Sequence, residues 1–525
     1  MKRRSFIAGG ALALGACHPE RVITGGFNGA SVERGHLLRA SLPSSPPVST
    51  RKVDVLIAGG GIAGLSAARA LRLAGVDDFL LLDLEDSAGG NSRGATIAKL
   101  ACPLGAHYLP VPGDNAPEVR DFLEEIGLAK RVAGHWTFDE RHLCHSPQER
   151  LFINGQWQGG LLPVLGVGEE TLAQYRKLSR LVTEANRHAR FRVPLRGPVP
   201  ASHRALDAIT FAAWLDRERL DDAYLRWYLD YCCRDDYGAG TSIVSAWAGI
   251  HYFASRHGFS APGDDADRDL LLTWPEGNAW LAKRLADPLG ERIVTGRLVF
   301  RIAALKHAIE VDAYNVATRQ VERFEAAQCI AAMPLFIAAR LLTAPSRALA
   351  DAVRHMPYAP WAVANIHIEA PLADRPGAPP SWDNVLYGAT GLGYVDAGHQ
   401  KLDPLPDPTI LTYYRAMGDD PQGRARLLSR EWATWRDDVL DELSVPHPDL
   451  RSKTLSIDVA RWGHAMAVPV PGTRSSHALE SLQRTQAGLW RRLHFAHSDL
   501  SGYSVFEEAF THGWRAGNAV KKALA

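Results

Sequence analysis

A glycine-rich turn between an apolar run and a helical pattern constrains the fold of this chain more than any other feature. Residues 53–58 (VDVLIA) have the length and composition of a buried parallel strand, and apolar residues follow a helical spacing over 62–73. The turn between them, "GGGIAG", places Gly59, Gly61 and Gly64 in the pattern G-x-G-x-x-G. A second apolar run follows in "DFLLLDLED", so these residues predict a βαβ unit.

This unit indicates a dinucleotide-binding turn. The first glycine permits the tight turn, the second lets the backbone approach a pyrophosphate, and the third lets the helix pack on the strand. The helix N-terminus, with Ile62 and Ala63, directs free amides at the phosphates. Asp83 ends the second strand 19 positions after Gly64, where an acid accepts hydrogen bonds from an adenosine ribose. NAD and FAD both satisfy this unit, and a glycine turn without a ligand is the structural alternative.

The N-terminus predicts export. Arg3 and Arg4 precede an apolar run from Phe6 to Ala16, which is shorter than the roughly 20 residues that span a bilayer. The arginine pair resembles the twin-arginine signal of proteins that fold before translocation. "LGAC" resembles a lipoprotein cleavage box, which would make Cys17 a lipidated membrane anchor. We therefore expect the twin-arginine export machinery as a partner and a location on the periplasmic side; a basic N-terminus with accidental apolar residues is the alternative.

Charge and cysteine content narrow the function. The formal net charge is +1 and basic clusters are absent, so the electrostatic footprint of nucleic-acid binding is missing. Six cysteines are present, and Cys17 as an anchor leaves an odd number without regular spacing. We expect no obligatory disulfide network.

Four further segments resemble motifs of the flavin-containing amine oxidase superfamily, which includes monoamine and polyamine oxidases, protoporphyrinogen oxidase and phytoene desaturases. They are "DLEDSAGGNSRG" with "LGAHYLP", "TWPEGNAWLAKRLA" with "TGRLVFRI", "VARWGHAMAVPVPG", and "LHFAHSDLSGYSVFEEAFTHGWRAGNAV". The resemblance covers both ends and the middle of residues 52–525. It implies FAD as cofactor and an α/β fold: a discontinuous Rossmann-like FAD-binding domain with an inserted α+β substrate-binding domain of helices on a mostly antiparallel sheet.

The length of 525 residues exceeds what a single core sustains, in agreement with more than one domain. Gly, Ser and Pro without periodicity predict a tether before the folded body. The expected division is an export signal at 1–17, a linker at 18–51, the FAD-binding domain at 52–110, 270–335 and 455–525, and the substrate domain at 111–269 and 336–454.

The resemblance also implies which residues bind the cofactor. Asp83 would lie at the ribose, and the backbone of Val299 at the adenine. A helix opening after Ser504, whose spacing to Glu507 is that of a capping box, would direct its N-terminus at the pyrimidine edge of the flavin, where negative charge develops on reduction. The other implied positions are Gly89, Gly90 and Arg93 at the pyrophosphate, Gly105, Ala106, His107 and Tyr108 near the isoalloxazine, Ser498 and Asp499 near the ribityl chain, and Val505 at the helix start.

Four departures from the family pattern qualify this assignment. Asn91 stands where the family usually has Arg, so either Arg93 supplies that positive charge or no residue does. The acidic residue usual in the C-terminal motif falls at Ser498, with Asp499 next to it.

Residues 461–473 contain no cysteine for a covalent flavin link, so we expect non-covalent FAD. The lysine that many amine oxidases hold over flavin N5 aligns with Val363 or Ala364. Branches of the superfamily that act on carbon–carbon or ring carbon–nitrogen bonds also lack that lysine.

Aromatic and titratable residues provide weaker candidates. Trp462, Tyr413 and Tyr414 have the character of aromatic walls for a cation or a planar group, with core packing as the alternative. His464 is a candidate acid or base near neutral pH, with a structural role as the alternative. A calcium loop at residues 265–276 is disfavoured because Leu270 replaces the required glycine, and His142, Cys144 and His145 form no complete metal set.

The sequence thus predicts an exported FAD-dependent oxidoreductase that acts on a small-molecule substrate. A hydride would pass from a C–H bond, expected to be alpha to an amine, to flavin N5, and oxygen or a membrane quinone would reoxidise the flavin. One alternative is a dehydrogenase of the desaturase or protoporphyrinogen-oxidase kind. The other is a flavin-binding accessory protein without turnover.

Overall fold

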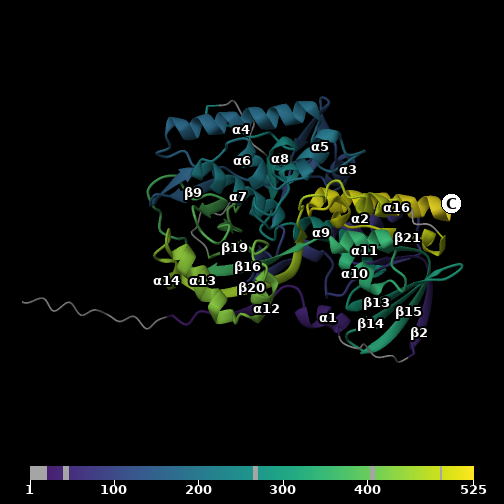
Figure 1. Cartoon of the computed structure of the whole chain (residues 1–525). Helices are drawn as coiled ribbons and strands as arrows, with labels where there is room; N and C mark the ends of the chain where they lie inside the picture. The colour runs from purple at the N-terminus through teal and green to yellow at the C-terminus, as the bar shows by residue number, and fades with distance from the viewer. Residues whose placement is uncertain (1–20, 40–45, 264–269, 402–407, 485–487) are drawn as a thin grey trace, which may run out of the picture.

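A computed structural model describes residues 21–39, 46–263, 270–401, 408–484 and 488–525. The arginine pair, Cys17 and the aspartates at 265, 267 and 269 lie outside these residues. None of the helices in the described ranges is long and apolar enough to cross a membrane. Two sheets organise the molecule, one toward each end of the view in Figure 1.

The first sheet contains the expected βαβ unit. Its seven strands follow the order β12 (Ile293–Val294), β3 (Phe79–Leu82), β2 (Ser49–Ala58), β15 (Gln320–Ala331), β14 (Ile309–Asn315) and β13 (Arg297–Ala304), with β21 (Leu493–Phe495) also paired to β15. Strands β12, β3, β2, β15 and β21 are parallel, whereas β13, β14 and β15 form an antiparallel meander. Helix α2 (Ile62–Leu73) connects β2 to β3, as predicted.

The C-terminal helix packs against the helix of the βαβ unit on this sheet. Helix α16 (Phe506–Leu524) lies against α2, and Figure 1 shows the C-terminal helix beside it. A Cβ on Gly513 would lie 2.0 Å from the backbone oxygen of Ala63, so only glycine permits this approach. Helix α3 (Pro117–Glu125) joins the same core through Phe122, whose ring is 5.5 Å from that of Phe510.

The second sheet has eight strands and carries the substrate-side helices. Its order is β1 (Thr24–Asn28), β20 (Thr454–Ala467), β16 (Tyr358–Ile368), β19 (Thr409–Ala416), β18 (Tyr394–Asp396), β17 (Asp383–Leu386), β9 (Glu149–Ile153) and β10 (Gln156–Gly159). Only β1–β20 and β17–β9 pair in parallel, so the expectation of a mostly antiparallel sheet is confirmed.

Helices cover both faces of this sheet. One face packs against a core that includes residues of α4 (Glu169–His188), α6 (Phe211–Arg217), α7 (Ala223–Tyr237) and α8 (Ala246–Ala254), and the other against α13 (Trp432–Ser444) and α14 (Leu450–Lys453). The remaining elements used below are β5 (Leu100–Pro103), β6 (Tyr108–Pro110), α5 (Ala201–Asp207), α10 (Leu335–Leu341), α11 (Arg347–Arg354) and the 3₁₀ turn η6 (Ser498–Ser501).

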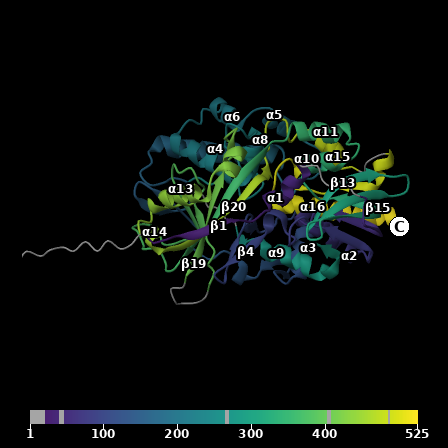
Figure 2. The same ribbon diagram turned by 90° about the horizontal axis from the view of Figure 1, so that it is seen from below.

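The structure corrects three expected boundaries. Residues 24–39 are not a tether: β1 pairs with β20, as Figure 2 shows, and α1 (Val32–His36) is tied to the first domain by a salt bridge from Arg34 to Asp86 at 2.8 Å. An edge strand needs backbone pairing but no side-chain periodicity, so the sequence carried no signal for it. Strand β20 belongs to the second sheet, so the expected domain boundary at residue 455 falls within a strand. Helix α3 packs with the first domain, although residues 111–269 were expected in the substrate domain.

Candidate cofactor and substrate site

The glycine turn after β2 forms a cradle that is open at one position. Gly59 has φ +115°, and a Cβ there would lie 2.2 Å from the oxygen of Ala332. A Cβ on Gly64 would lie 1.9 Å from the oxygen of Gly59. At Gly61 the nearest atom is instead the Cα of Gly90, at 3.9 Å. The first and third glycines are therefore required by the fold, and the second leaves the backbone accessible to a ligand.

The start of α2 fits a pyrophosphate. Its N-cap residue, Gly61, makes no side-chain hydrogen bond to the helix, and the first turn, which includes Ile62 and Ala63, carries no acidic residue. Amides of an uncapped helix N-terminus together with the helix dipole favour an anion. The residues present here therefore suit the phosphates of a dinucleotide.

A second glycine turn lies beside the first. The amide of Gly89 donates to the oxygen of Gly60 at 2.8 Å, and Gly89 and Gly90 both have positive φ. The carboxylate of Asp83 accepts from the amide of Gly60 at 2.8 Å and from that of Glu85 at 2.8 Å. Burial raises the pKa of Asp83. Asp83 is thus fixed at the end of the cradle where a ribose was expected.

Asn91 and Arg93 have different roles at the second turn. Asn91 links the second glycine turn to two other segments. Its side-chain Nδ2 donates to the backbone oxygen of Ala465 at 2.6 Å, and its backbone oxygen accepts from the amide of Ala106 at 2.9 Å. Arg93 donates to the oxygen of Gly90 at 3.3 Å and forms a salt bridge with Glu85 at 3.3 Å. The positive charge beside the glycine turn therefore comes from Arg93.

Val299 lies near the ribose end of the cradle. In β13, the amide of Arg297, two residues earlier, donates to the oxygen of Asp83 at 2.8 Å. Val299 itself is buried in one cluster with Leu82, the residue before Asp83. This placement is compatible with a backbone contact to an adenine.

Residues 105–108 lie where aromatic side chains from the second sheet reach the cradle. The indole of Trp462 donates to the oxygen of Leu104 at 2.6 Å, and the hydroxyl of Tyr414 donates to the oxygen of Gly105 at 3.0 Å. The ring of His107 stacks on Tyr414 with centroids 4.3 Å apart. Trp462 and Tyr414 are therefore placed beside the expected flavin segment, in agreement with their interpretation as walls.

The register of β16 and β19 shows which residue of each candidate pair, Val363 or Ala364 and Tyr413 or Tyr414, lies on the face of the sheet next to the site. Val363 lies opposite Tyr414, and both belong to the core on the α7–α8 side of the sheet. Ala364 and Tyr413 lie opposite each other and belong to the core on the α13 side. Val363 is thus the position that corresponds to the missing lysine on the site's face, and Tyr413 is a core residue.

His464 points away from this centre. Its ring lies 4.5 Å from Phe336, and it does not line the cavity described below. Burial, and then the charge of Arg424, lowers its pKa to about 4. His464 is therefore neutral near pH 7, and its position against Phe336, outside the cavity lining, supports the structural alternative.

Asp499 is held by contacts within the protein. One oxygen of its fully buried carboxylate accepts from the hydroxyl of Tyr358 and, at 2.9 Å, from the amide of Leu335, the first residue of α10. The other oxygen lies 3.0 Å from Nδ1 of His497 and makes no hydrogen bond to a described residue. The side chain thus joins α10 and β16 to η6, and a contact of Ser498 or Asp499 with a ribityl chain stays a prediction.

The start of α16 differs from the expected capping box. Val505 is the N-cap residue, and Ser504 accepts instead from the amide of Ala467 at 3.0 Å, at the end of β20. The helix therefore begins without a side-chain cap, so no capping side chain occupies the amides of its first turn. Glu507, in the first turn, is buried, and burial raises its pKa to about 7.

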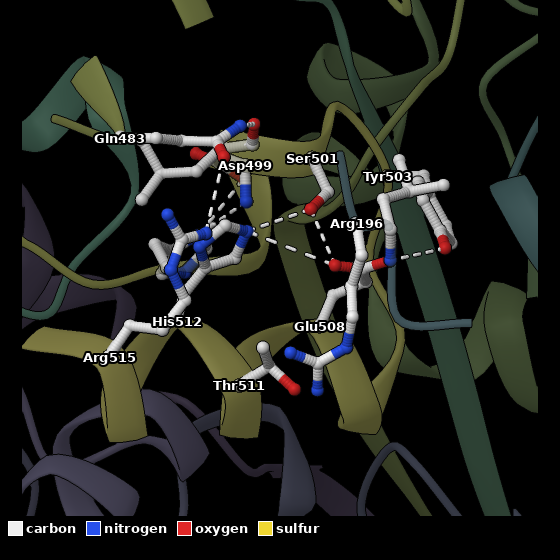
Figure 3. A network of polar contacts seen from close by, with 12 residues as sticks. Arg196, Gln483, Asp499, Ser501, Tyr503, Glu508, Thr511, His512 and Arg515 are labelled. Atoms are coloured by element: carbon white, nitrogen blue, oxygen red, sulfur yellow. Dashed lines mark hydrogen bonds and ion pairs between the residues drawn. The ribbon is translucent and has the colours of Figure 1, made fainter. Parts of the chain in front are cut away.

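A buried polar network fixes the first turns of α16 (Figure 3). The carboxylate of Glu508 accepts from the hydroxyls of Tyr503 and Ser501, each at 2.6 Å, and from the amide of Leu195 at 2.6 Å. Ser501 also lies 2.7 Å from Nε2 of His512, whose pKa burial lowers to about 3. Sequence reasoning missed this network, although two adjacent glutamates on an otherwise apolar helix face are an unusual pattern.

A small cavity of about 120 Å³ lies next to His107 and Tyr108. Aromatic side chains provide much of its wall, and three carboxyl groups face it: Glu149, Asp235 and Asp383. Aromatic lining residues are Tyr108, Tyr231, Tyr252, Trp382, Tyr394 and Tyr414.

The cavity is acidic, and Asp235 and Asp383 hold their protons more tightly than free carboxyl groups do. Burial raises the pKa of Asp235 to about 7, and burial together with Asp235 and Glu149 raises that of Asp383 still further. Among the described lining residues the only guanidinium is that of Arg256, which already forms a salt bridge with Asp236 at 3.0 Å. Asp235 and Asp383 form no salt bridge among the described residues, and carboxyl groups placed among aromatic faces in this way favour a ligand that carries positive charge. No sequence motif brings these three residues together, so sequence reasoning did not identify them.

Comparison with known proteins agrees with this geometry. The family model described as flavin containing amine oxidoreductase matches residues 62–521. A probable flavin-containing monoamine oxidase A of Dictyostelium discoideum is 24% identical over 306 residues, which cover 56% of this chain and 60% of that protein. This chain therefore spans less than two thirds of the curated relative.

Solved structures show the same fold over nearly the whole chain. A double mutant of putrescine oxidase has a TM-score of 0.68 at 18% identity and covers 90% of this chain and 99% of its own. Cyclohexylamine oxidase from Brevibacterium oxydans IH-35A has a TM-score of 0.65 at 19% identity and covers 91% and 100%. The predicted α/β class, a Rossmann-like domain with an inserted α+β domain, is confirmed.

Proposed function

Because the chain belongs to the flavin containing amine oxidoreductase family, we propose that it oxidises a small aliphatic amine at the carbon alpha to nitrogen. Its cofactor is FAD, which the cradle of Gly59–Gly64 fits. When bound, FAD supplies the two-electron oxidation by accepting a hydride at N5, and oxygen or a quinone takes the electrons. The observation that carries the proposal is the acidic, aromatic cavity beside His107 and Tyr414.

The charges of the cavity select an ammonium group. Asp235 and Asp383 attract a cation, and the rings of Tyr414 and Trp382 offer their negative faces to it. His107 does not oppose this charge, because burial lowers its pKa to about 3 and keeps it neutral. The chain's own residues thus bind and orient the amine and exclude water from it.

The size of the cavity limits the substrate. A protein cavity of about 150 Å³ holds benzene, and the one here measures about 120 Å³. An unbranched diamine of four or five carbons is of suitable length and has a second ammonium group for the carboxyl groups. The fold shared with putrescine oxidase supports this choice.

One observation favours a second function. Val363 provides no amine at the position of the family's lysine, as in branches of the superfamily that dehydrogenate apolar substrates. The carboxyl groups in the cavity argue against such substrates, because an apolar ligand would leave them buried without a partner. A flavin-binding role without turnover is the remaining alternative.

Anaerobic stopped-flow reduction of the bound flavin distinguishes these functions. We expect putrescine and cadaverine to bleach the flavin absorbance, and hydrogen peroxide to appear when air is admitted. Reduction by protoporphyrinogen and not by any amine would establish the second function. Stable flavin that no substrate reduces would establish the accessory role. Either result overturns the proposal of amine oxidation.

We further propose that the protein is exported in the folded state and anchored through Cys17 on the periplasmic side. The arginine pair and the cleavage-like box support this. Strand β1 begins at Thr24, so an anchor at Cys17 would hold the folded body close to the membrane surface. Replacing Arg3 and Arg4 with Lys should retain the protein in the cytoplasm, and Cys17→Ala should release it in soluble form from the membrane fraction. Unchanged fractionation of both variants would contradict the proposal.

A further inference from the structure

A second cavity, of about 340 Å³, lies between α5, α8 and the segment 190–200. It shares no lining residue with the acidic cavity. Its walls are basic and aromatic and contain no acidic residue: they include Arg190, Arg192, Arg474, His203, Phe191 and Trp247. The lining of this cavity thus differs in character from the acidic lining of the proposed amine site.

Two donors at this cavity have no acceptor. The Nε of Arg474 and the indole nitrogen of Trp247 make no hydrogen bond to any described residue. Trp247 is 1% exposed, so its indole nitrogen is shielded from water. Arg474 forms no salt bridge within the described ranges, and burial lowers its pKa. Buried donors without partners cost about 1–3 kcal/mol each, so an acceptor supplied by a ligand would stabilise them.

Arg474 is the candidate to bind a negatively charged group. Arg196, which also lines the cavity, is neutralised by Glu118, with both carboxylate oxygens within 2.7 Å. Arg190 is exposed at the rim, where solvent screens it.

Arg192 and Arg474 are half-buried, and Arg474 has the unpaired Nε. The charges of Glu508 and Asp207 act to raise the pKa of Arg474, against the larger effect of burial, but neither forms a salt bridge with it. A guanidinium pairs with one carboxylate in a bidentate geometry.

The aromatic walls indicate an apolar body for the same ligand. The ring of Phe191 lies 4.2 Å from that of His203, and the ring of Trp247 lies 4.6 Å from that of His251. Burial lowers the pKa of His251 to about 3, so this histidine is neutral at physiological pH. Neutral rings bury hydrocarbon well but offer nothing to a strongly hydrated ion such as phosphate.

We propose that this cavity is a binding site for an organic monocarboxylate with an apolar body, whose carboxylate is bound by Arg474. The wall is already in place, because the carboxylate of Glu508 holds the amide of Leu195 and that of Glu118 holds Arg196. Since Glu508 lies in the first turns of α16, a ligand here would contact a wall that is continuous with the helix expected at the flavin. The site is separate from the proposed amine oxidation and does not depend on it.

Isothermal titration of the FAD-loaded protein with phenylacetate tests the proposal. We expect saturable binding with one site per chain, and at least tenfold weaker binding of phenylacetamide, which lacks the charge, and of acetate, which lacks the body. Putrescine should not displace phenylacetate, because the two cavities share no residue. Tighter binding of inorganic phosphate than of phenylacetate would overturn the choice of carboxylate, and displacement by putrescine would place the ligand in the amine site.

Variants assign the binding to this cavity. Arg474→Gln should weaken phenylacetate at least tenfold, and Arg474→Lys should weaken it less. Because Arg474 is partly buried, Phe191→Leu gives a second test on the apolar wall, with an expected loss of several-fold. Arg347→Gln, an exposed arginine on α11 outside the cavity, is the matched control and should bind as the parent does. Folded Arg474 and Phe191 variants with unchanged affinity would overturn the proposal.

Discussion

Replacement of Asp235 by Asn should make the protein more stable and bind amines less well. Asp235 lies in a cavity with two other carboxyl groups, and burial raises its pKa from 3.8 to about 7. A carboxyl group with a raised pKa in the fold holds its proton more tightly there than in the unfolded chain. Its ionisation therefore opposes folding as the pH rises above 3.8, and the penalty stops growing above about pH 7.

The size of this penalty follows from linkage. For these two pKa values the cost to folding is about 2 kcal/mol at pH 5 and about 4 kcal/mol at pH 8. Asn has nearly the same shape and cannot ionise. The stability advantage of Asp235→Asn should therefore grow by about 2 kcal/mol between pH 5 and pH 8.

Binding should change in the opposite sense. A hydrogen bond to a charged group contributes about 1.5–3 kcal/mol, so loss of this carboxylate should weaken putrescine about tenfold to hundredfold. In the parent protein, putrescine affinity should rise as the pH passes 7, because Asp235 then becomes charged. Asp235→Asn should flatten this rise.

Urea unfolding at pH 5 and pH 8, combined with putrescine titration over the same range, measures both effects. Asp121→Asn, at an exposed position on α3, removes a carboxylate far from the cavity and should change neither quantity. The reasoning is refuted if Asp235→Asn has the parent's urea midpoint at pH 8, or if it binds putrescine with the parent's affinity and pH dependence.

Three further predictions concern the cradle and its surroundings. Gly61→Ala should fold normally but bind FAD at least tenfold more weakly in a fluorescence titration, and full FAD affinity would contradict the cradle. Gly59→Ala should fail to fold, since its Cβ would lie 2.2 Å from a backbone oxygen. Gly513→Ala should lower the free energy of unfolding by about 1–3 kcal/mol, as overpacking does, because its Cβ would meet the oxygen of Ala63; an unchanged denaturation midpoint would argue against the α2–α16 contact. His464→Gln should leave the pH profile of flavin reduction between pH 6 and 9 unchanged, because His464 is already neutral there. If the variant instead loses the rise or the fall of that profile, His464 acts as an acid or base in the reaction.

Features encoded by local geometry were predictable. The turn at residues 59–64 requires positive φ and close backbone approach, which only glycine permits, so its pattern is visible in the sequence. The strands and helix around it follow from hydrophobic periodicity. Asp83 follows because its position is fixed by the length of the same βαβ unit.

The sequence could not show which of two neighbouring residues of similar chemistry faces the site. Val363 and Ala364, or Tyr413 and Tyr414, alternate between the two faces of one sheet, and the sequence does not reveal which face adjoins the site. Ser504 has the spacing of a helix cap, yet it binds the end of β20, because a tertiary contact offered a better donor. The capping-box prediction was therefore wrong, although the predicted helix was present.

The sequence by itself determined the cofactor cradle, its βαβ frame and the family whose motifs recur in order along the chain. Only the tertiary structure decided which acidic and basic side chains lie together. Glu149, Asp235 and Asp383 come from β9, α7 and β17 and meet in one cavity, and Arg474 meets His203 and Trp247 in another. The physical reason is that a motif records the backbone conformation of a few consecutive residues. The electrostatic environment of a side chain depends instead on segments that are distant in sequence and adjacent only after the sheets and helices have packed.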